Sequence, residues 1–490
     1  MAEIHIHTPS KELSATANAG ERLLDALRRA GVNVTAPCGG LGRCGKCRAS
    51  VNGEEVLACQ YVMTGDAEVT VQELRGGAIL ASEETVSGGG GKRLGAALDL
   101  GTTTLALKLY DLATGVCVGQ RAAWNAQAAY GADVITRAQY CMEHPEGTAV
   151  LCSTVKGQLN EMLKSLGTET SSLTSLFVAG NTIMQHLFAG LDPSPIAAAP
   201  FTPRTLFEAS ERFAPCVAGY VGGDITAGLL ASGLFEKKGR YLYLDVGTNG
   251  EMALGGEDGF LCCAVASGPA FEGAGIACGM AGIDGAVSHV HFTDGALSFD
   301  VIGGGEAKGL CGSGLVDLAA LMCREGIITA SGLLLPPEEA PGKWAAYLRE
   351  DEDGNGVFFL TPKVYLTARD VRQLQLAKAA VAAGIRVLLK KSGTAMDEVQ
   401  GLYLAGGFGS FLDPDAAAGI GMLPAELACK TAVLGNTSLA GAGMALTDKT
   451  ARRRLQSIQR ACRYIELSGD SDFNEEYPEQ MFFYEEDDDE

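Results

Sequence analysis

Long hydrophobic runs are missing from this chain of 490 residues. No stretch approaches the ~20 consecutive apolar residues that a membrane-spanning helix needs. The N-terminal segment MAEIHIHTPSKEL is of mixed character and lacks the apolar run of a signal peptide. We therefore expect a cytoplasmic protein that does not associate with a membrane.

Positive charge is also scarce. The chain has 38 Lys and Arg against 59 Asp and Glu, a net charge of −21, and residues 466–490 hold twelve acidic residues without one Lys or Arg. A surface that binds nucleic acid needs clustered Lys and Arg to displace the counterions of the phosphates. The composition argues against a nucleic-acid partner and predicts an acidic C-terminal tail over residues 464–490.

Regularly spaced cysteine pairs are lacking outside a single loop. Of the 15 cysteines, eleven lie elsewhere in the chain without paired spacing. Disulfide frameworks belong to oxidising compartments, whereas cytosolic proteins keep their thiols reduced. The cysteine pattern therefore also favours a reducing, cytosolic environment.

The one organised cysteine loop is APCGGLGRCGKC, residues 36–47. Together with a later cysteine it forms a C-x5-C-x2-C-x11-C array of Cys38, Cys44, Cys47 and Cys59. Four thiolates on a glycine-rich loop are the ligands of a [2Fe–2S] cluster, and the spacing is close to that of plant-type ferredoxins. A structural zinc site is the alternative, although such sites usually pair two C-x2-C knuckles.

Glycine is abundant in this loop and in the whole chain. The loop glycines lack a Cβ, so that the backbone can fold closely over an inorganic core and turn its N–H groups toward sulfur. They are Gly39, Gly40, Gly42 and Gly45. Over the whole chain glycine accounts for 65 residues, about twice the usual share of ~7%. Many tight turns and close backbone approaches are therefore expected, as in nucleotide-binding folds.

The pattern around the cysteine loop predicts a small β-grasp domain over residues 1–75. Alternating apolar and polar residues indicate an N-terminal hairpin, apolar positions in residues 20–31 indicate an amphipathic helix, and short strand patterns follow the loop. Residues 76–93 contain four consecutive glycines and predict a flexible linker.

Two similar turns predict a phosphate-binding fold in the rest of the chain. An apolar strand pattern ends in Asp99-Leu100-Gly101 followed by Thr102, Thr103 and Thr104, and about 146 residues later a second one ends in Asp245-Val246-Gly247-Thr248-Asn249. Backbone N–H groups and hydroxyls of such turns can face phosphate oxygens, and an Asp at the strand end can hold Mg²⁺ through water. Their recurrence indicates an internal duplication with nucleotide bound between the halves.

Further segments complete the expected nucleotide site. The strand pattern LYLAGGFG runs into the turn Gly406-Gly407-Phe408, where adenine could pack on backbone. Residues 368–391 have apolar positions at helical spacing, and residues 435–446 predict a helix whose small residues suit close packing. Glu272 lies in a glycine-rich loop and is our candidate for orienting water as a general base; a capping role is an equal alternative.

The two phosphate turns and the adenosine turn resemble those of the actin–hexokinase–Hsp70 (ASKHA) superfamily. The resemblance implies an ATP-binding domain of two lobes, at about residues 94–240 and 241–463, with ATP and Mg²⁺ between them. The implied fold class is α/β and α+β multidomain, a β-grasp [2Fe–2S] ferredoxin domain followed by a duplicated actin-like ATPase. By position, Asp99 and Asp245 would be catalytic, and the remaining turn residues would bind the cofactor.

The combination of both parts resembles the reductive activators of corrinoid-dependent methyltransferases. The motifs that carry it are the cysteine loop, LDLGTTT, VAGNTIMQHLFAGLDP, LDVGTNGE, SGPAFEGAGI, CGSGLVD and YLAGGFG, which together span residues 36–446. The family implies that one electron passes from the cluster to the cobalt(II) form of a corrinoid methyl-carrier protein, restoring cobalt(I) at the expense of ATP. Some members have a further domain between the ferredoxin and ATP-binding parts, where this sequence predicts only a linker.

The same resemblance implies partners and leaves alternatives. A ferredoxin or flavodoxin would supply the electrons, and the actin-like domain could pair as a homodimer. The alternatives are an ATP-driven donor to another metalloenzyme, as in activators of 2-hydroxyacyl-CoA dehydratases, a small-molecule kinase of the same fold, or a redox-sensing ATP-binding scaffold. A kinase has no use for the cysteine loop, and the dehydratase activators lack a ferredoxin domain.

Overall fold

The computed structural model describes residues 2–484 apart from residues 10, 11, 33, 35, 37, 43, 44, 72–92 and 294. The predicted ligand Cys44, nearly all of the predicted linker and residues 485–490 therefore lie outside the described residues. The chain divides into two compact units, Met1–Phe213 and Ala214–Glu490. Among the described residues, no helix combines the length and apolar character needed to cross a membrane.

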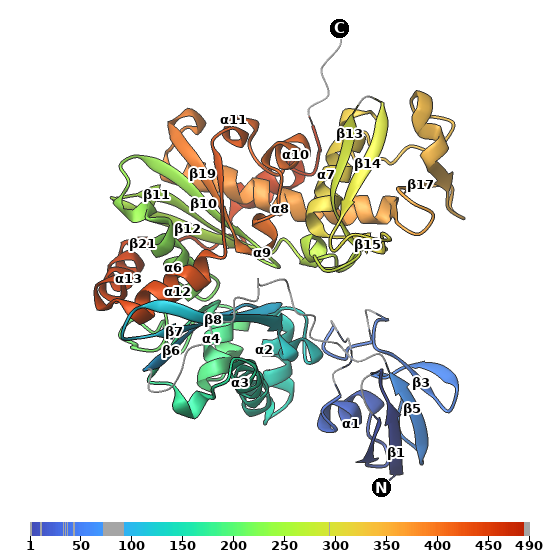
Figure 1. Cartoon of the computed structure of the whole chain (residues 1–490). Coiled ribbons are helices and arrows are strands. Elements are labelled where there is room, and N and C mark those ends of the chain that lie inside the picture. The colour runs from blue at the N-terminus through green and yellow to red at the C-terminus, as the bar shows by residue number, and fades with distance from the viewer. Residues whose placement is uncertain are drawn as a thin grey trace. The chain divides into compact units, whose positions relative to one another are not determined.

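The first unit begins with the predicted cluster domain (Figure 1, blue). Its strands are β1 (Ala2–His7), β2 (Glu12–Ala17), β3 (Arg48–Val51), β4 (Glu54–Leu57) and β5 (Ala67–Val71), joined by helix α1 (Leu23–Arg29). The sheet order is β2-β1-β5-β3-β4 with β1 and β5 parallel. The β-grasp prediction is confirmed, because alternating residues of β1 and β5 and the apolar stripe of α1 form one core.

The second sheet of this unit carries the first predicted phosphate turn. Its strands are β6 (Leu94–Leu100), β7 (Thr104–Asp111), β8 (Val116–Trp124) and β9 (Ser175–Gly180), in the order β8-β7-β6-β9. The strict alternation of buried residues in β7 follows its apolar pattern TLALKLYD. The helices of this part are η1 (Ala126–Ala129), α2 (Val134–Glu143), α3 (Gly147–Ser165), η2 (Thr170–Ser172), α4 (Thr182–Ala189) and α5 (Ser194–Ala197).

The second unit contains a six-stranded sheet with the other two predicted turns. Its strands are β10 (Arg240–Val246), β11 (Gly250–Gly256), β12 (Gly259–Val265), β19 (Val399–Ala405), β20 (Thr431–Gly435) and β21 (Cys462–Tyr464), in the order β20-β19-β10-β11-β12-β21. Two three-stranded sheets complete the unit: β13 (Ala286–Thr293), β14 (Ala296–Val301) and β15 (Gly309–Leu310), then β16 (Leu348–Glu350), β17 (Gly356–Phe359) and β18 (Tyr365–Thr367).

The duplication expected from the two turns is visible in the strand order. In each unit an antiparallel three-stranded meander is followed, after an insertion, by a strand parallel to its first strand: β6 pairs with β9, and β10 pairs with β19. The order β8-β7-β6-β9 therefore matches β12-β11-β10-β19. Both phosphate turns join the first two strands of such a meander.

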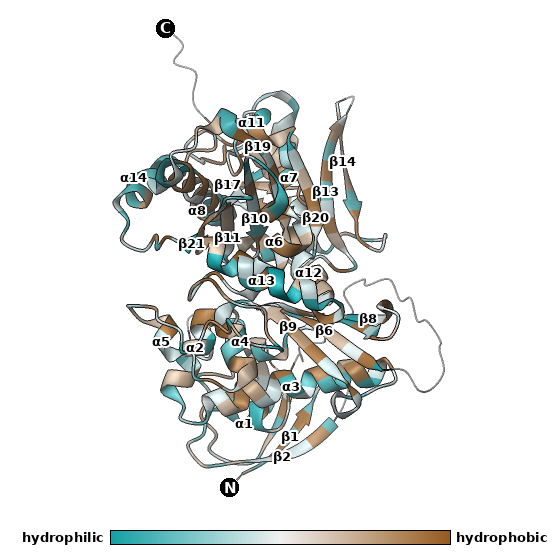
Figure 2. Ribbon diagram, turned by 90° about the vertical axis from the view of Figure 1, so that its left-hand side faces the viewer, coloured by the Kyte–Doolittle hydropathy of each residue, from teal (hydrophilic) through white to brown (hydrophobic). Residues whose placement is uncertain are grey.

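The described helices of the second unit include α8 (Ala368–Ser392), which packs against β11 and β12 of its large sheet. These helices are α6 (Gly223–Ser232), η3 (Leu234–Glu236), η4 (Pro269–Glu272), α7 (Gly312–Arg324), η5 (Gly342–Tyr347), α8, η6 (Met396–Glu398), α9 (Gly406–Gly409), α10 (Pro414–Gly419), α11 (Ala425–Ala428), α12 (Thr437–Thr447), α13 (Lys449–Ala461) and α14 (Ser471–Glu479). The long helix predicted at 368–391 is confirmed as α8, which starts at a capping box of Thr367 and Asp370. Figure 2 shows hydrophilic residues along α13 and α14.

The segment after residue 464 is partly helical and packs on the second unit. Lys390 and Lys391 of α8 form ion pairs with Asp472 of α14 at 2.6 Å. Further along, Phe483 is buried, and its N–H donates to the Ala330 carbonyl at 2.9 Å. Within the predicted acidic tail, Phe483 therefore packs against its own chain, whereas Phe482 and Tyr484 are exposed.

Candidate functional site

The cysteine loop is built as its glycines suggest. All four loop glycines have a positive φ, between 64° and 102°, which side-chain-bearing residues rarely adopt. A Cβ on Gly42 would stand 2.7 Å from the Gln60 side-chain amide nitrogen. The loop glycines thus adopt backbone conformations that favour glycine, whereas the predicted approach of their N–H groups to sulfur stays a prediction.

Of the three described cysteines of the array, Cys47 and Cys59 are in side-chain contact with each other. Cys47 and Cys59 are buried, whereas Cys38 is half-buried. The pKa of the Cys59 thiol rises to about 11, first through burial and then through its hydrogen bond with Cys47, while a backbone hydrogen bond from Gly42 opposes the rise. A buried thiol of this kind ionises only beside a cation, and metal ligation supplies one. With Cys44 outside the described residues, no group of three potential ligands within the described part could by itself hold a metal ion.

Residues far apart in the sequence fix the first phosphate turn. The Asn125 side-chain amide donates to the Gly101 carbonyl at 2.9 Å, and its N–H donates to the Thr103 carbonyl at 2.8 Å. The buried Arg137 donates to the Thr102 carbonyl at 2.7 Å. With the carbonyls occupied in this way, the turn keeps one backbone shape. The sequence motif did not reveal Asn125 or Arg137, because neither lies within the motif.

The second phosphate turn is held by its own side chains and by the Glu272 loop. The Thr248 hydroxyl donates to the Glu272 carboxylate at 2.9 Å, and the Ser267 hydroxyl donates to the Gly247 carbonyl at 3.2 Å. The Gly247 N–H donates to the Asn249 carbonyl at 2.9 Å. The structure thus brings Glu272 to the predicted phosphate turn, where its carboxylate is half-buried.

The predicted adenosine turn meets the same region of the second unit. Gly406 has φ +86°, and a Cβ there would overlap the carboxylate of Asp245, so that only glycine fits this close approach. The ring of Phe408 stacks on Phe271 at 4.8 Å with an angle of 12° between the planes. Gly407 is exposed, with open space where a side chain would stand. Asp245, Glu272 and the predicted adenosine turn therefore lie near one another in the second unit, whereas Asp99 belongs to the first unit.

The strand register reveals an equivalence that the motifs alone did not suggest. Asp99 lies opposite Ala179 on β9, just as Asp245 lies opposite Ala405 on β19. The residues that follow are Gly180 and Asn181 in the first unit and the adenosine turn in the second. Asn181 caps α4, accepting a hydrogen bond from the Ile183 N–H at 3.0 Å. The shared Ala-Gly after an apolar strand was the available signal.

A cavity of about 640 Å³ lies elsewhere in the second unit, between β13, α7 and α10. His289 and Asp317 lie at its wall, 2.9 Å apart, and burial raises the pKa of Asp317. None of the residues predicted to bind nucleotide lines this cavity. This cavity therefore lies apart from the predicted nucleotide-binding turns.

Comparison with known proteins identifies the family. Residues 240–490 match the family model described as the C-terminal, ASKHA domain of RACo, and residues 94–237 match the RACo middle region. Residues 6–74 match the 2Fe-2S iron-sulfur cluster binding domain. The chain belongs to the RACo family. The RACo middle region covers nearly the same residues as the predicted first lobe, about 94–240. The sequence predicts these residues to be part of the ATP-binding fold and predicts no separate domain between it and the linker.

Relatives of this RACo-family chain match along most of their length. A solved structure titled reductive activator for corrinoid,iron-sulfur protein is 30% identical, covers 99% of this chain and 98% of its own, and superposes with a TM-score of 0.72. The corrinoid activation enzyme RamQ of Eubacterium limosum is 33% identical over 79% of this chain and 70% of that protein. A [Co(II) methylated amine-specific corrinoid protein] reductase of Methanosarcina barkeri is 26% identical over 73% of this chain and 70% of that protein.

Proposed function

We propose that this protein uses ATP to pass one electron from a [2Fe–2S] cluster to the cobalt(II) form of a corrinoid methyl-carrier protein. Family membership makes the chain a reductive activator of corrinoid proteins. The observation that supports the electron route is the presence, in one chain, of a glycine-built cysteine loop and of paired phosphate turns. In the balanced step the reduced cluster loses one electron and cobalt(II) becomes cobalt(I).

We assign the cluster to Cys38, Cys44, Cys47 and Cys59. The cluster would supply a one-electron carrier, and the chain supplies its surroundings. The buried Cys47 and Cys59 place two ligands away from water, and the left-handed loop glycines let N–H groups approach the sulfurs. The backbone hydrogen bond from Gly42 to Cys59 favours the thiolate that a metal needs.

We assign ATP and Mg²⁺ to the two phosphate turns and the adenosine turn. Asp99 and Asp245 are the next-to-last residues of the first strands of the two meanders and are our candidates for holding Mg²⁺. Gly101, Thr102, Thr103 and Thr104 would face phosphate in the first unit, and Gly247, Thr248 and Asn249 in the second. Gly406, Gly407 and Phe408 would contact the adenosine. Glu272, held by Thr248, would orient the attacking water.

The need for ATP follows from the energetics of a one-electron step. Each 59 mV of uphill potential lowers the equilibrium constant tenfold and costs about 1.4 kcal/mol. A ferredoxin-type cluster that is less reducing than the cobalt couple therefore needs an added free-energy source. The protein can draw this from nucleotide binding and hydrolysis, provided that the conformations it favours differ in their interaction with the corrinoid protein.

The proposed partners follow from the same function. A ferredoxin or flavodoxin would reload the cluster, and the corrinoid methyl-carrier protein would receive the electron. A homodimer through the actin-like domain is part of the proposal, as is a cytoplasmic location without nucleic-acid or membrane partners.

The deciding experiment is anaerobic and spectroscopic. Reduced protein is mixed with a cobalt(II) corrinoid methyl-carrier protein, and growth of the cobalt(I) band is recorded with and without Mg-ATP. We expect the band only with ATP, its loss in Cys59→Ser and its strong reduction in Asp245→Asn. Cys429→Ser is the matched control, because this exposed cysteine lies outside the cluster loop. A cluster-loaded, ATP-hydrolysing protein that leaves every tested carrier at cobalt(II) would contradict the proposal.

A further inference from the structure

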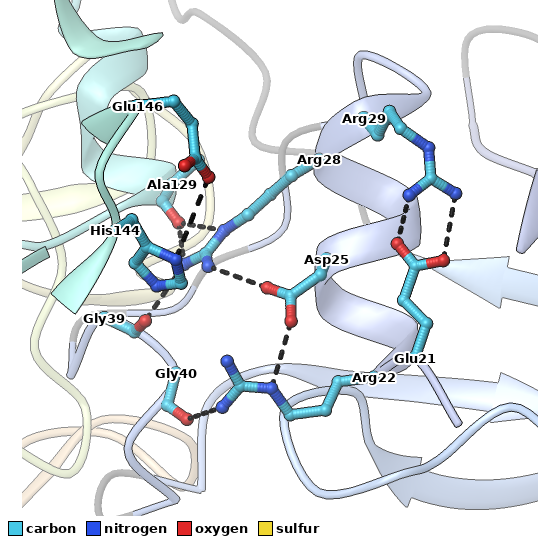
Figure 3. Close-up of polar contacts among 10 residues, drawn as sticks. All are labelled: Glu21, Arg22, Asp25, Arg28, Arg29, Gly39, Gly40, Ala129, His144 and Glu146. Carbon is cyan, nitrogen blue, oxygen red and sulfur yellow. Dashed lines mark hydrogen bonds and ion pairs between the residues drawn. The ribbon is translucent and has the colours of Figure 1, made fainter. Parts of the chain in front are cut away.

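A buried arginine connects the cluster domain to the next part of the first unit. Arg28 lies in the last turn of α1, and its side chain is only 5% exposed. Its Nε–H donates to the Ala129 carbonyl at 2.8 Å, across 101 residues of sequence, and a second N–H of its guanidinium reaches the same oxygen (Figure 3). The Nη2 group also donates to the Gly39 carbonyl of the cysteine loop at 3.2 Å. One side chain therefore joins α1, the cluster loop and the end of η1.

Aromatic rings complete the surroundings of this guanidinium. It lies 5.1 Å from the ring centre of Tyr130 and 5.7 Å from that of Tyr140, and the two ring centres are 5.1 Å apart. Asp25 stands 3.4 Å from Nη1. Burial lowers the pKa of Arg28, and burying a charge is costly unless it is paired and hydrogen-bonded. The carbonyls, the carboxylate and the rings together offset that cost.

The cluster loop itself takes part in this contact. Arg22 donates to the Gly40 carbonyl at 3.4 Å, and a Cβ on Gly39 would stand 3.2 Å from the Tyr130 carbonyl, which leaves little room for a side chain. The predicted ligand Cys38 shares a small recess with Thr136, Gln139 and Tyr140 of α2. The face of η1 and α2 therefore meets the loop that carries the cluster ligands.

The same face is tied to the first phosphate turn. Arg137 of α2 is fully buried; its Nε–H donates to the Gly131 carbonyl at 2.9 Å, and its Nη2 donates to the Thr102 carbonyl at 2.7 Å. Asn125, which precedes η1, holds the turn at Gly101. Arg28 thus contacts residues 129 and 130 from the cluster domain. Arg137 binds the carbonyls of residue 131 and of Thr102 in the phosphate turn.

We propose that the η1–α2 face is a docking surface for the chain's own cluster domain, and that this docking is coupled to nucleotide binding at the first phosphate turn. The proposal rests on the proposed function, because it takes ATP as the ligand of that turn. Docking of Arg28 fixes the backbone of residues 129–131. Arg137 is in turn held by the Gly131 carbonyl, and it donates to the Thr102 carbonyl of the phosphate turn. The docked state therefore binds nucleotide more tightly, because less backbone must be ordered upon binding.

The coupling is reciprocal by thermodynamic necessity. If docking raises nucleotide affinity by some factor, nucleotide stabilises docking by the same factor, and such factors are typically ~5–150-fold. Nucleotide state would therefore set how much of the time the cluster loop rests against α2. ATP could in this way change the position of the cluster domain without any contact between nucleotide and cluster.

The first test compares nucleotide affinity among variants of the full-length, cluster-loaded protein. The Kd of a non-hydrolysable ATP analogue with Mg²⁺ is measured by calorimetry for the parent, Arg28→Met and Arg29→Met. We expect Arg28→Met to weaken binding at least ~5-fold, the lower end of typical coupling. Arg29→Met should stay within about twofold of the parent, because Arg29 is exposed and pairs with Glu21 inside the cluster domain.

A second variant changes the other side of the contact. Tyr140→Leu removes one ring from the guanidinium without changing any residue of the cluster domain, and we expect it to weaken binding of the analogue as Arg28→Met does. If Arg28→Met loses the visible spectrum of its cluster, Tyr140→Leu becomes the variant that tests whether docking raises nucleotide affinity. Hydrogen exchange provides the reciprocal readout: the analogue should increase protection of residues 126–140 and of α1 in the parent, and of α1 much less in Arg28→Met.

The outcomes separate this inference from the proposed function. One outcome would overturn the coupling and leave the proposed function standing. In it, Arg28→Met and Tyr140→Leu bind the analogue as tightly as the parent, although α1 in these variants has lost its protection from hydrogen exchange. A parent that does not bind the analogue at all would contradict the nucleotide part of the proposed function and the coupling with it.

Discussion

Single residues decide how the second phosphate turn could act on ATP. Glu272 sits in a glycine-rich loop, 24 residues beyond Thr248, and accepts its hydroxyl at 2.9 Å. Sequence reasoning left two roles open for this glutamate, general base or cap. Its contact with Thr248 brings the carboxylate to the predicted phosphate turn, and two substitutions can separate the roles.

The first prediction concerns Glu272→Gln, which keeps shape and removes the base. We expect ATP hydrolysis to fall by ~10²-fold or more, the usual contribution of a positioned base, while nucleotide affinity changes little. Steady-state hydrolysis and calorimetric Kd measure the two quantities. Glu257→Gln, an exposed residue after β11, is the control and should leave both unchanged. Equal loss of binding and hydrolysis would instead indicate a purely structural role.

The second prediction concerns the hydroxyl that holds this carboxylate. Thr248→Val keeps the volume but removes the hydroxyl that donates to Glu272; we expect this loss to cost about 1–3 kcal/mol and to lower kcat for ATP hydrolysis. Thr248→Ser restores the hydroxyl and should recover most of the activity. If the serine variant is as impaired as the valine variant, the methyl group and not the hydrogen bond matters.

At the scale of elements, close helix packing in the second unit depends on missing side chains. A Cβ on Gly441 of α12 would overlap the backbone of Ala227 in α6, and the Tyr243 hydroxyl, bonded to Thr437 at 2.7 Å, fills the space beside Gly228. The sequence predicted a tightly packed helix at 435–446, and α12 confirms it. Which helix it would pack on could not be foreseen.

The third prediction follows from this packing. Gly441→Ala should destabilise the second unit by about 1–3 kcal/mol, the usual penalty for overfilling a packed contact. Gly157→Ala is the matched control: its helix α3 has open space at that position, so a gain of up to about 1 kcal/mol from helix propensity is expected. Urea denaturation measures both, and a neutral Gly441→Ala would mean that α6 and α12 can separate at little cost.

The fourth prediction concerns Lys378 of α8, which fixes the C-terminal segment by donating to the Phe482 carbonyl. Burial lowers its pKa to about 8 from 10.5. Between these values the unfolded chain carries a proton that the folded protein lacks, so that stability should rise with pH from about 8 to 10.5. In Lys378→Met this pH-dependent gain in stability should be absent. The measurement compares the change in unfolding free energy between pH 7.5 and pH 10 in the variant and in the parent. The same pH slope in both proteins would contradict the assignment.

At the scale of the whole molecule, the cluster domain has a core of its own. Residues between Ile4 and Val71 form one apolar cluster, and the large cluster of the second unit runs from Leu242 to Phe483 with no shared residue. The two parts should therefore respond separately to damage. Arg28 adds a polar contact between the cluster domain and η1 of the first unit.

The fifth prediction uses this separation. Cys47→Ser should abolish the cluster spectrum and lower the thermal transition of the cluster domain, because metal binding contributes folding free energy only where its ligands lie. The thermal transition of the second unit should change less than that of the cluster domain, because the two have separate apolar clusters. A calorimetric scan shows both, and a parallel loss of both transitions would indicate one cooperative unit.

Sequence alone determined much of this protein. The cysteine loop with its glycines, the two phosphate turns and α8 follow from local rules, because spacing, turn residues and periodicity act over a few residues. The family and the fold class were predicted from these motifs and are confirmed. The roles of the site residues stay predictions.

Only the tertiary structure decided what lies beside these motifs. The match between Ala179 and Ala405 depends on strand register. The contact of Glu272 with Thr248 depends on a loop that returns to the turn. The contacts of Arg28 and Arg137 depend on surfaces whose residues are tens of positions apart in the sequence. None of these pairs is signalled by local spacing. They form because buried charges and carbonyls must find partners wherever the fold brings them.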